Sequence, residues 1–560
     1  LRYRAMTRPN PEPIDQWSYY DYKPVMQQRG STSLLPGWVP PDDRRRLAAY
    51  MMLAAYVRNN GRAWLPTTLN EDEVLGRREY GDPATIVDSV VSSLLGEEQH
   101  ILVKGAIGED PAVPGAVAQQ VLLEEWAKKE RLLSKMLENE RRSVELGDAV
   151  YVLGWDQQKG RPRLRVYDPG FYFPVLDPED DVEFPSTVHL CWEFEAKDEK
   201  GDKQKYLRRI TWSLMDMGSD DEGKPVAATL PWEEDPSNKR CFLWDGTWLL
   251  EDIDHMTGLF DLSVQAGEWT IYGQDLGIDF IPVIHVPNSI SEIEHFGTSS
   301  LARVLQILDD IVSTDTDLQA SSATTGSPPI AVNGQNIPTQ DGKIQTYGPG
   351  TVLQTGDGSA TMIDTANSLN ALLEYDKHLL SRLSVNSRIP EALLGRVKPN
   401  EVPSGIALAL GFTPHANLIK EMRLIRRQKY ELLLKFVSRM YVQAQILTEV
   451  HEAGLFFGSF LPADRQEAST LVTQLYRDQN PIISLETALR ILIEAGMPIE
   501  DAAKEIERIM HGDLEGANRL LDATGDSGLV YQRLGLQASA AAVTETTDVQ
   551  DPATDLPDGA

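Results

Sequence analysis

The sequence has few cysteines and no long apolar run. Cys191 and Cys241 are the only cysteines among 560 residues, so at most one internal disulfide can form, which favours a reducing compartment. The longest aliphatic run, Leu47–Val57, is 11 residues long, whereas a membrane-spanning helix needs about 20. No signal-peptide pattern opens the chain. We therefore expect assembly in the cytoplasm and no membrane partner.

Motifs for nucleotide hydrolysis and metal catalysis are also missing. The sequence contains neither Gly-x-x-x-x-Gly-Lys-Ser/Thr nor His-Glu-x-x-His. His189 and Cys191 lie two residues apart on a predicted strand and could bind a metal, but nothing nearby completes a tetrahedral set. We favour a buried strand pair for these two residues. We expect no catalytic residue, no metal and no cofactor.

Positive charge is scarce, above all in one segment. The formal net charge of -31 argues against tight non-specific binding of nucleic acid, which depends on Lys and Arg, although not against DNA passing nearby. Between residues 304 and 376, Lys343 is the only basic residue. The nine acidic residues of this segment are Asp309, Asp310, Asp315, Asp317, Asp341, Asp357, Asp364, Glu374 and Asp376. We expect a surface with so much negative and so little positive charge to face an acidic partner without binding it.

The first half of the chain predicts an α+β fold. The length suggests three or four structural units. Helical periodicity begins at Pro41, and recurs at Pro83–Leu95, with Asp82 as N-cap, and in one long helix at Pro114–Leu146 that Gly147 ends. Alternating patterns then predict antiparallel-type strands at Ala149–Trp155, Arg163–Tyr167, Thr187–Glu195, Lys205–Leu214, Cys241–Leu250, Glu268–Tyr272 and Phe280–Val286.

The second half is mainly helical. A helix capped by Thr298 or Ser299 carries one apolar stripe and ends before Pro328, and a Gly-rich stretch of short strands and turns follows. A second helix, a loop and a long helix from near Gly405 come next, and Pro414 must kink or split the long helix. Further helices are predicted at Thr470–Asp478, Leu485–Ala495 (cap Ser484, stop Gly496) and Pro498–His511.

Two charged features have alternative interpretations. The pairs Asp309–Asp310 and Asp315–Asp317 could be catalytic or metal-binding carboxylates, but without a neighbouring His we favour a solvated acidic face. The long helix carries a basic face whose residues could contact either a DNA backbone or a neighbouring subunit, and we favour subunit packing. Its candidate residues are Lys420, Arg423, Arg426 and Arg427.

The order of parts resembles that of portal proteins of tailed bacteriophages, particularly the siphophage type. Three segments carry the resemblance. The first, Asp148–Val152 followed by Tyr167–Pro169 and Phe171–Val175, looks like the strand entry into the wing domain. The second, His295–Leu301, looks like the start of the first stem helix. The third, Ser404–Leu408 before a long charged helix, looks like the exit from the tunnel loop.

The resemblance implies a ring-forming portal fold: an α+β wing, a two-helix stem, a small β-containing clip, a long kinked helix and a helical crown. Its implied boundaries are 41–297 for the wing, 298–325 and 368–389 for the stem helices, 326–367 for the clip, 390–404 for the tunnel loop, 405–447 for the long helix and 448–536 for the crown. Composition separately predicts an N-terminal arm with little structure of its own at 1–40, which is polar and contains several prolines, and a disordered acidic tail at 537–560, which is rich in Ala, Thr and Asp.

The resemblance further implies a homo-dodecamer at one capsid vertex of the virion. Double-stranded DNA would pass through its channel during packaging and ejection. Terminase, and later a head–tail adaptor, would dock on the clip, and major capsid protein and scaffold would surround the wing. The family has no enzymatic activity of its own.

Several residues receive roles within this scheme. Because a channel wall must not retain a polyanion, we expect the acidic stem residues Asp309, Asp310, Asp315, Asp317, Glu374 and Asp376 to line the channel. The stem's apolar stripes would pack against neighbouring subunits. The tunnel loop would include Arg396, Lys398, Pro399, Asn400 and Glu401. Candidate docking residues of the clip are Asn333, Asp341, Lys343 and Tyr347.

Two alternatives remain open at this point. The chain could be another structural virion component, such as a minor capsid or adaptor protein, although adaptors are typically much smaller. A metal-dependent hydrolase that uses the acidic clusters is a second alternative, and it predicts loss of activity on chelation.

Overall fold

The computed structural model describes most of the chain between residues 35 and 509. The described residues are 35–60, 79–96, 99–106, 113–176, 184–197, 203–218, 230–232, 239–253, 259–260, 268–289, 294–326, 330–333, 339–340, 343–344, 359–362, 366–396, 405–458, 465–476, 482–494, 505–506 and 509. The chain forms two compact units, Leu1–Phe460 and Leu461–Ala560, and each is described by itself.

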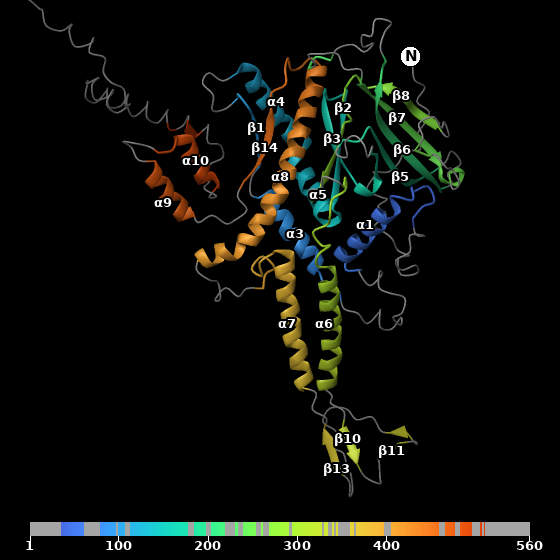
Figure 1. The fold of residues 1–560 in the computed structure, drawn as a ribbon, viewed down its shortest axis with the longest axis vertical. Helices are drawn as coiled ribbons and strands as arrows, with labels where there is room; N and C mark the ends of the chain where they lie inside the picture. The colour runs from blue at the N-terminus through green and yellow to red at the C-terminus, as the bar shows by residue number, and fades with distance from the viewer. Residues whose placement is uncertain are drawn as a thin grey trace, which may run out of the picture. The chain divides into compact units, whose positions relative to one another are not determined.

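The first unit mixes helices with antiparallel sheets, which confirms the α+β class and the antiparallel character of the predicted strands (Figure 1). Its largest sheet has the strand order β4-β5-β6-β7-β8. The strands are β4 (Tyr172–Val175), β5 (Thr187–Lys197), β6 (Lys203–Asp216), β7 (Lys239–Leu249) and β8 (Glu268–Asp275). Strand β4 is not among the strands predicted from alternation, although it lies in the segment Phe171–Val175 that resembles the strand entry into a portal wing.

The centre of β5 is buried almost continuously, from Val188 to Phe194. His189 and Cys191 both lie in this buried stretch, which confirms their interpretation as a buried strand pair. The Nδ1 atom of His189 is 2.8 Å from the Thr211 hydroxyl. Burial, aided by Arg209, lowers the pKa of His189 to about 3. Cys191 and Cys241 are both buried and form no disulfide.

A second sheet has the order β3-β2-β9. Its strands are β2 (Asp148–Asp156), β3 (Arg161–Tyr167) and β9 (Val283–Pro287). Val150 of β2 pairs with Tyr167 of β3 on one side and with His285 of β9 on the other. Strand β9, the last of these strands in the sequence, therefore lies next to β2, the first. This pairing brings the start of the predicted stem close to the end of the preceding helices.

Among the described residues, the helices that precede these sheets are α1 (Arg44–Val57), α3 (Asp82–Leu95), α4 (Pro114–Glu130) and α5 (Leu132–Leu146). The prediction of one helix over Pro114–Leu146 is wrong. Arg131 has φ 54° and ψ 50°, a left-handed conformation that ends α4 and starts α5. Glu130 stabilises the break, because its carboxylate accepts hydrogen bonds from the Leu164 amide and from Lys135. The tertiary contact to β3 thus overrides the continuous helical pattern.

Two further expectations about this region need correction. Asp82 is not the N-cap of α3: the cap position is Gly81, and Asp82 is the first helical residue. Residues 35–40, which we assigned to an arm with little structure of its own, pack into the core, where Leu35, Trp38 and Val39 are buried. The indole of Trp38 donates a 2.8 Å hydrogen bond to Glu193 of β5, which holds this segment against the large sheet.

The segment 448–536, which the resemblance assigns to a helical crown, contains a strand near its start. Strand β14 (Ala453–Phe457) pairs antiparallel with β1 (Gln99–Val103), so it belongs to the first unit, which ends at Phe460. Neither strand was expected. Each is short, and its partner lies some 350 residues away along the chain, so no local pattern marks the pair.

A helical hairpin and a long helix complete the first unit. The hairpin consists of α6 (Leu305–Gly326) and α7 (Ala366–Ser387), and between them lie the paired strands β10 (Ile330–Asn333) and β13 (Ser359–Met362) and the pair β11 (Thr339–Gln340) and β12 (Lys343–Ile344). The predicted helix start at Thr298 is wrong, because residues 301–304 form turns. Helix α8 (Gly405–Gln443) is continuous through Pro414, and its ribbon is bent rather than split (Figure 1).

The second unit contains α9 (Arg465–Leu475) and α10 (Leu485–Glu494), which pack against each other. Ser484 caps α10 as predicted, because its hydroxyl accepts a 3.2 Å hydrogen bond from the Thr487 amide. Gly496, most of the predicted helix 498–511 and the tail 537–560 lie outside the described residues, as does the arm up to residue 34. In the part of the chain that is described, no helix is long and apolar enough to cross a membrane.

Candidate functional site

The α6–α7 hairpin is held together by apolar residues within one chain. Of the predicted stripe, Leu301 and Val304 just before α6 and Leu308 and Ile311 within it are buried, as are the Leu379 and Leu383 side chains of α7, and the two helices contact each other. We had expected such stripes to pack against neighbouring subunits. The stripe is already covered inside the chain, so that expectation is wrong for these residues.

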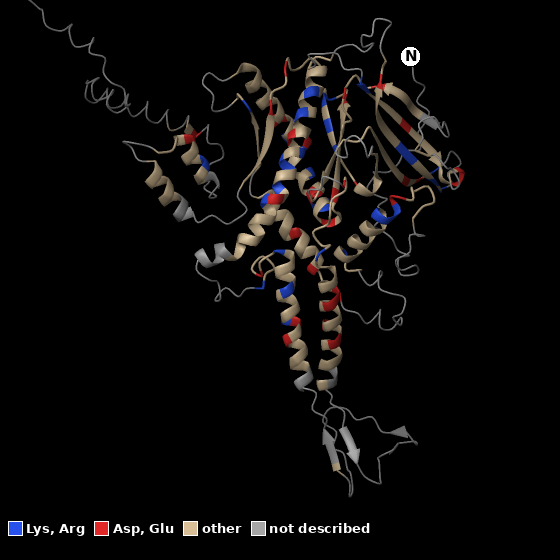
Figure 2. Cartoon of the chain, viewed as in Figure 1, with Lys and Arg blue, Asp and Glu red and all other residues tan. Residues whose placement is uncertain are grey.

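The charges of the hairpin are distributed unevenly between its helices. Helix α6 contains four aspartates and neither Lys nor Arg. Helix α7 has a balanced set, Glu374 and Asp376 against Lys377 and Arg382. Acidic side chains therefore recur along α6, as Figure 2 shows. The negative charge belongs to one helix rather than to the hairpin as a whole.

The six predicted channel-lining acids divide into two groups. Asp310, Asp317 and Glu374 are exposed. Asp310 and Asp317 are seven residues apart, about two turns, so they share one face of α6. Asp309, Asp315 and Asp376 are only partly exposed. The hydroxyl of Tyr56 lies 2.9 Å from Asp309 Oδ2 and 3.0 Å from Oδ1, which connects α6 to α1.

Asp315 and Asp376 belong to a group of charges where the two hairpin helices approach α3. Burial, followed by the nearby Asp376 and Asp82 carboxylates, raises the pKa of Asp315, and Arg396 opposes this shift. Burial likewise raises the pKa of Asp376, again opposed by Arg396. The guanidinium of Arg396 donates a 3.0 Å hydrogen bond to Asp82. We call Asp82, Asp315, Asp376 and Arg396 the Arg396 cluster.

The loops expected to carry docking and tunnel residues are described only in part. Asn333 ends β10, opposite Ser359 of β13. Lys343 pairs with Gln340 in the β11–β12 ladder. Asp341, Tyr347 and the tunnel-loop residues Lys398, Pro399, Asn400 and Glu401 lie outside the described residues. Arg396 is the tunnel-loop residue whose contacts the structure gives.

The basic residues of α8 do not form one exposed face. Arg426 is fully buried, and its Nε donates a 2.9 Å hydrogen bond to Glu140 of α5, which is equally buried. Arg426 also donates to the Ser143 hydroxyl and the Asn288 side chain. The prediction of a DNA or subunit contact is therefore wrong for Arg426, because its charge is neutralised within the chain.

The other three predicted contacts of α8 differ among themselves. Arg423 is partly buried and donates hydrogen bonds to the carbonyl groups of Leu94 and Ser93 at the end of α3. This location favours cation binding because carbonyl oxygens are exposed at a helix C-terminus. Lys420 and Arg427 are exposed. Of the predicted basic residues, these two remain candidates for an external partner.

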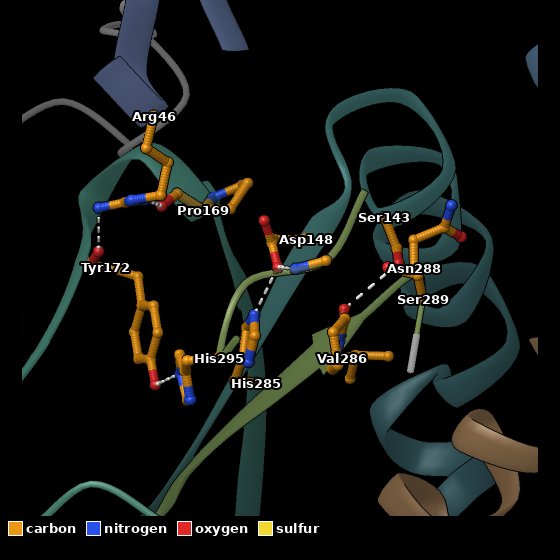
Figure 3. A network of polar contacts seen from close by, with 12 residues as sticks. Arg46, Ser143, Asp148, Pro169, Tyr172, His285, Val286, Asn288, Ser289 and His295 are labelled. Atoms are coloured by element: carbon orange, nitrogen blue, oxygen red, sulfur yellow. Dashed lines mark hydrogen bonds and ion pairs between the residues drawn. The ribbon is translucent and has the colours of Figure 1, made fainter. Parts of the chain in front are cut away.

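A buried polar network lies where the second sheet meets the segment leading to the hairpin. Its centre is Asp148, the first residue of β2, which is 1% exposed. One carboxylate oxygen lies 2.7 Å from His285 Nε2 of β9 and accepts a 2.7 Å hydrogen bond from the Gly297 amide (Figure 3). The other oxygen accepts a hydrogen bond from the hydroxyl of Tyr50 in α1. One side chain thus connects three segments that are distant in sequence.

Aromatic rings extend the network. The His285 and His295 rings are stacked with centroids 4.4 Å apart, and Tyr172 Oη is 2.9 Å from His295 Nε2 (Figure 3). Arg46 of α1 donates hydrogen bonds to the carbonyl groups of Pro169 and Tyr172. The rings and the guanidinium together hold residues 295–297 against α1 and the strand ends.

Two glycines allow the backbone to pass through this junction. A Cβ atom on Gly297 would lie 2.3 Å from the Gly147 carbonyl oxygen and 2.5 Å from the Asn288 amide nitrogen. Gly147 itself has φ +104°, which favours glycine. The Asn288 amide donates a 2.8 Å hydrogen bond to the Gly147 carbonyl. Position 297 therefore has no room for a side chain, because the end of α5, the end of β9 and the entry to the hairpin meet there.

Sequence reasoning used some residues of this junction only to mark domain boundaries. Asp148, Tyr172, His295 and Gly297 all lie in the segments that resemble portal proteins, but their mutual contact was not expected. The local signal available was an acidic residue at the start of an apolar strand, next to a glycine. Among the described residues, no group of three His, Cys, Asp or Glu side chains is placed to hold a metal ion.

A comparison of the chain with known protein families and with curated proteins finds no match.

Proposed function

We propose that this chain is the subunit of a portal ring of a tailed bacteriophage, which conducts double-stranded DNA into and out of a capsid. The observation that carries the proposal is the charge of α6: four aspartates without a basic residue, with Asp310 and Asp317 exposed on one face. In a ring, each such face would be repeated by every subunit and would form circles of negative charge around a central channel.

The physical role of these circles is to keep DNA moving. Carboxylates repel phosphates over a distance set by salt, about 8 to 10 Å at physiological ionic strength. A duplex in the channel would then meet no cationic group on α6 that could hold it. Of the six acids first assigned to the lining, Asp310, Asp317 and Glu374 fit this role best because they are exposed. Asp309, Asp315 and Asp376 act within the chain.

Contact between subunits is proposed to use the surface of α7, where three apolar side chains on different sides of the helix are exposed. Leu373, Tyr375 and Val385 are 42%, 50% and 67% exposed. A head-to-tail contact of such a surface with a different face of the next subunit closes into a ring when the rotation per subunit is right. The strands β10–β13, which follow α6 and precede α7, take the place of the clip. Lys343 on β12 and Asn333 on β10 remain its proposed docking residues.

The proposed roles of partners follow from this arrangement. Terminase and then a head–tail adaptor would bind the clip, and major capsid protein with scaffold would surround the α+β region within the virion. The ring itself is proposed to act without enzymatic activity. Lys420 and Arg427 are proposed contacts with a neighbouring subunit or a DNA backbone.

Electron microscopy and native mass spectrometry of the purified full chain test the proposal. We expect closed rings with a central opening wide enough for a duplex, at a mass that is a multiple of 62.4 kDa, with twelve subunits as the expected number. A compact monomer at all concentrations and in the presence of scaffold would refute the proposal.

A further inference from the structure

Residues 390–396, which follow α7, form a compact turn against α3. Within the turn, the Arg396 amide donates a 3.0 Å hydrogen bond to the Glu391 carbonyl, and Gly395 has φ +72°. The segment contacts α3 at two places. Ser89 donates to the Leu393 carbonyl at 3.5 Å, and Arg396 reaches Asp82 at the first turn. Arg396 is therefore the charged contact that holds the end of the turn.

The surroundings of Arg396 contain more negative charge than one guanidinium can neutralise. Asp82 of α3, Asp315 of α6 and Asp376 of α7 all act electrostatically on one another and on Arg396. The ion pair with Asp82 is 25% and 28% exposed at its two side chains, so water screens it in part. Three carboxylates from three helices thus compete for one cation.

Two buried atoms of this cluster make no hydrogen bond to the protein. They are Nη1 of Arg396, a donor, and Oδ1 of Asp376, an acceptor. A buried polar atom left unpaired is destabilising, because it has given up its hydrogen bonds to water. Since one atom is a donor and the other an acceptor, a hydrogen bond between Arg396 and Asp376 would satisfy both. Asp376 is therefore a second carboxylate, besides Asp82, that can accept a hydrogen bond from Arg396.

We propose that Arg396 is a two-position latch between the turn 390–396 and the helices around it. In one position, which the structure shows, Arg396 binds Asp82 and holds the turn on α3. In the other, Arg396 binds Asp376, with Asp315 beside it, and the turn is held by the hairpin. Gly395, whose added Cβ would meet no atom within 4 Å, gives the backbone room to rotate. The latch is a property of one chain and does not depend on the proposed portal function.

Hydrogen–deuterium exchange of the purified full chain tests the latch, with residues 389–396 and the start of α3 as the reporting segments. Arg396→Gln removes both positions and is expected to speed exchange of the turn at least tenfold. Asp82→Asn removes the observed position, and exchange should rise only about threefold because Asp376 still accepts Arg396. The double variant Asp82→Asn/Asp376→Asn should match Arg396→Gln.

Matched controls on the same helices are Asp310→Asn in α6 and Glu374→Gln in α7, which remove the same charge from exposed positions. Neither should change exchange of the turn by more than about a factor of 1.5. Exchange of β5 and β6 reports whether each variant is folded, and an unchanged value there is required before the turn is compared.

The decisive comparison is made in the Asp82→Asn background. If Asp376→Asn then speeds exchange of the turn by threefold or more, and does so only when Arg396 is present, the second position exists. If Asp82→Asn alone already equals Arg396→Gln and Asp376→Asn adds nothing, Arg396 has one position and the latch is wrong. If no variant changes exchange of the turn, Arg396 does not hold it at all.

Discussion

The carboxylates of the buried junction and those of α6 have opposite surroundings. Asp148 is 1% exposed and has hydrogen-bonding partners on α1, on β9 and in the segment before α6. Glu140 is fully buried and pairs with Arg426. Asp310 and Asp317, in contrast, are exposed on a helix without a basic residue.

The difference follows from the cost of burying charge. A buried carboxylate must have partners, because its desolvation is not otherwise offset. An exposed carboxylate is stabilised by hydration, and its electrostatic field extends into the surrounding solvent. The junction therefore uses charge to fix the fold, whereas the charge of Asp310 and Asp317 on α6 stays exposed to solvent. Four experiments, in order of decreasing expected effect on stability, test this contrast.

The largest effect is expected at the buried ion pair. Arg426→Ala leaves Glu140 buried without its cationic partner, although the Tyr430 hydroxyl still donates to it, and should lower the free energy of unfolding by about 3–5 kcal/mol. Chemical denaturation followed by tryptophan fluorescence measures it. Arg427→Ala, the exposed neighbour, is the matched control and should change stability by no more than about 0.5 kcal/mol. Equal effects of the two substitutions would mean that Arg426 is not a structural charge.

A smaller loss is expected where backbones meet. Gly297→Ala forces a Cβ atom against the Gly147 carbonyl and the Asn288 amide, and overpacking of this kind costs about 1–3 kcal/mol. Gly154→Ala in β2 is the control, since its Cβ would meet no atom within 4 Å. Thermal unfolding of both variants separates the close approach from the general effect of replacing a glycine. A Gly297→Ala variant as stable as the control would contradict the packing of the junction.

The third experiment concerns pH. Burial raises the pKa of Glu145 to about 7, against the weaker opposing effects of Arg58 and Arg141. Since the folded-state pKa lies above the usual glutamate value of 4.5, the stability that Glu145 contributes is full below about pH 4.5 and is lost as pH rises through about 7. Glu145→Gln should thus stabilise the chain by about 1–2 kcal/mol at pH 8 and change little at pH 4.5. Unfolding curves at the two pH values check this, and a gain independent of pH would contradict it.

The smallest effect on stability, and the largest on the proposed function, is expected on α6. Asp310→Lys/Asp317→Lys should leave the melting temperature within about 2 °C, because both residues are exposed. Ring assembly should persist, whereas DNA passage in a packaging and ejection assay should slow. Glu251→Lys/Asp252→Lys makes the same charge change at exposed residues outside the hairpin and should not slow passage. Normal passage in the α6 variant would exclude a role of these acids in the channel.

Elements that depend on local sequence patterns were predicted correctly, whereas features that depend on contacts between distant residues were missed. Strands β2, β5, β6 and β7 and helices α3 and α7 were located to within a few residues, because alternation and helical periodicity are local signals. The break at Arg131 and the β1–β14 pair were missed. The first depends on the contacts of Glu130 with β3, and the second on a partner some 350 residues away.

The candidate site shows the same division. The sequence identified the acidic segment and the absence of basic residues on α6, and composition alone suffices for that. It could not separate Asp310 and Asp317 from Asp309, Asp315 and Asp376, because exposure depends on how α6 packs against α1, α3 and α7. Nor could it show that Arg426 is paired internally, since Glu140 lies 286 residues away.

The sequence by itself determined the α+β class, most helices and strands, and the concentration of negative charge between residues 304 and 376. These properties depend on the order and spacing of residue types along the chain. Only the tertiary structure decided which charges are neutralised and which stay exposed, because partners such as Asp148 and Tyr50, or Arg426 and Glu140, meet only after distant segments pack together. Burial sets the cost of a charge, and burial is a property of the folded chain.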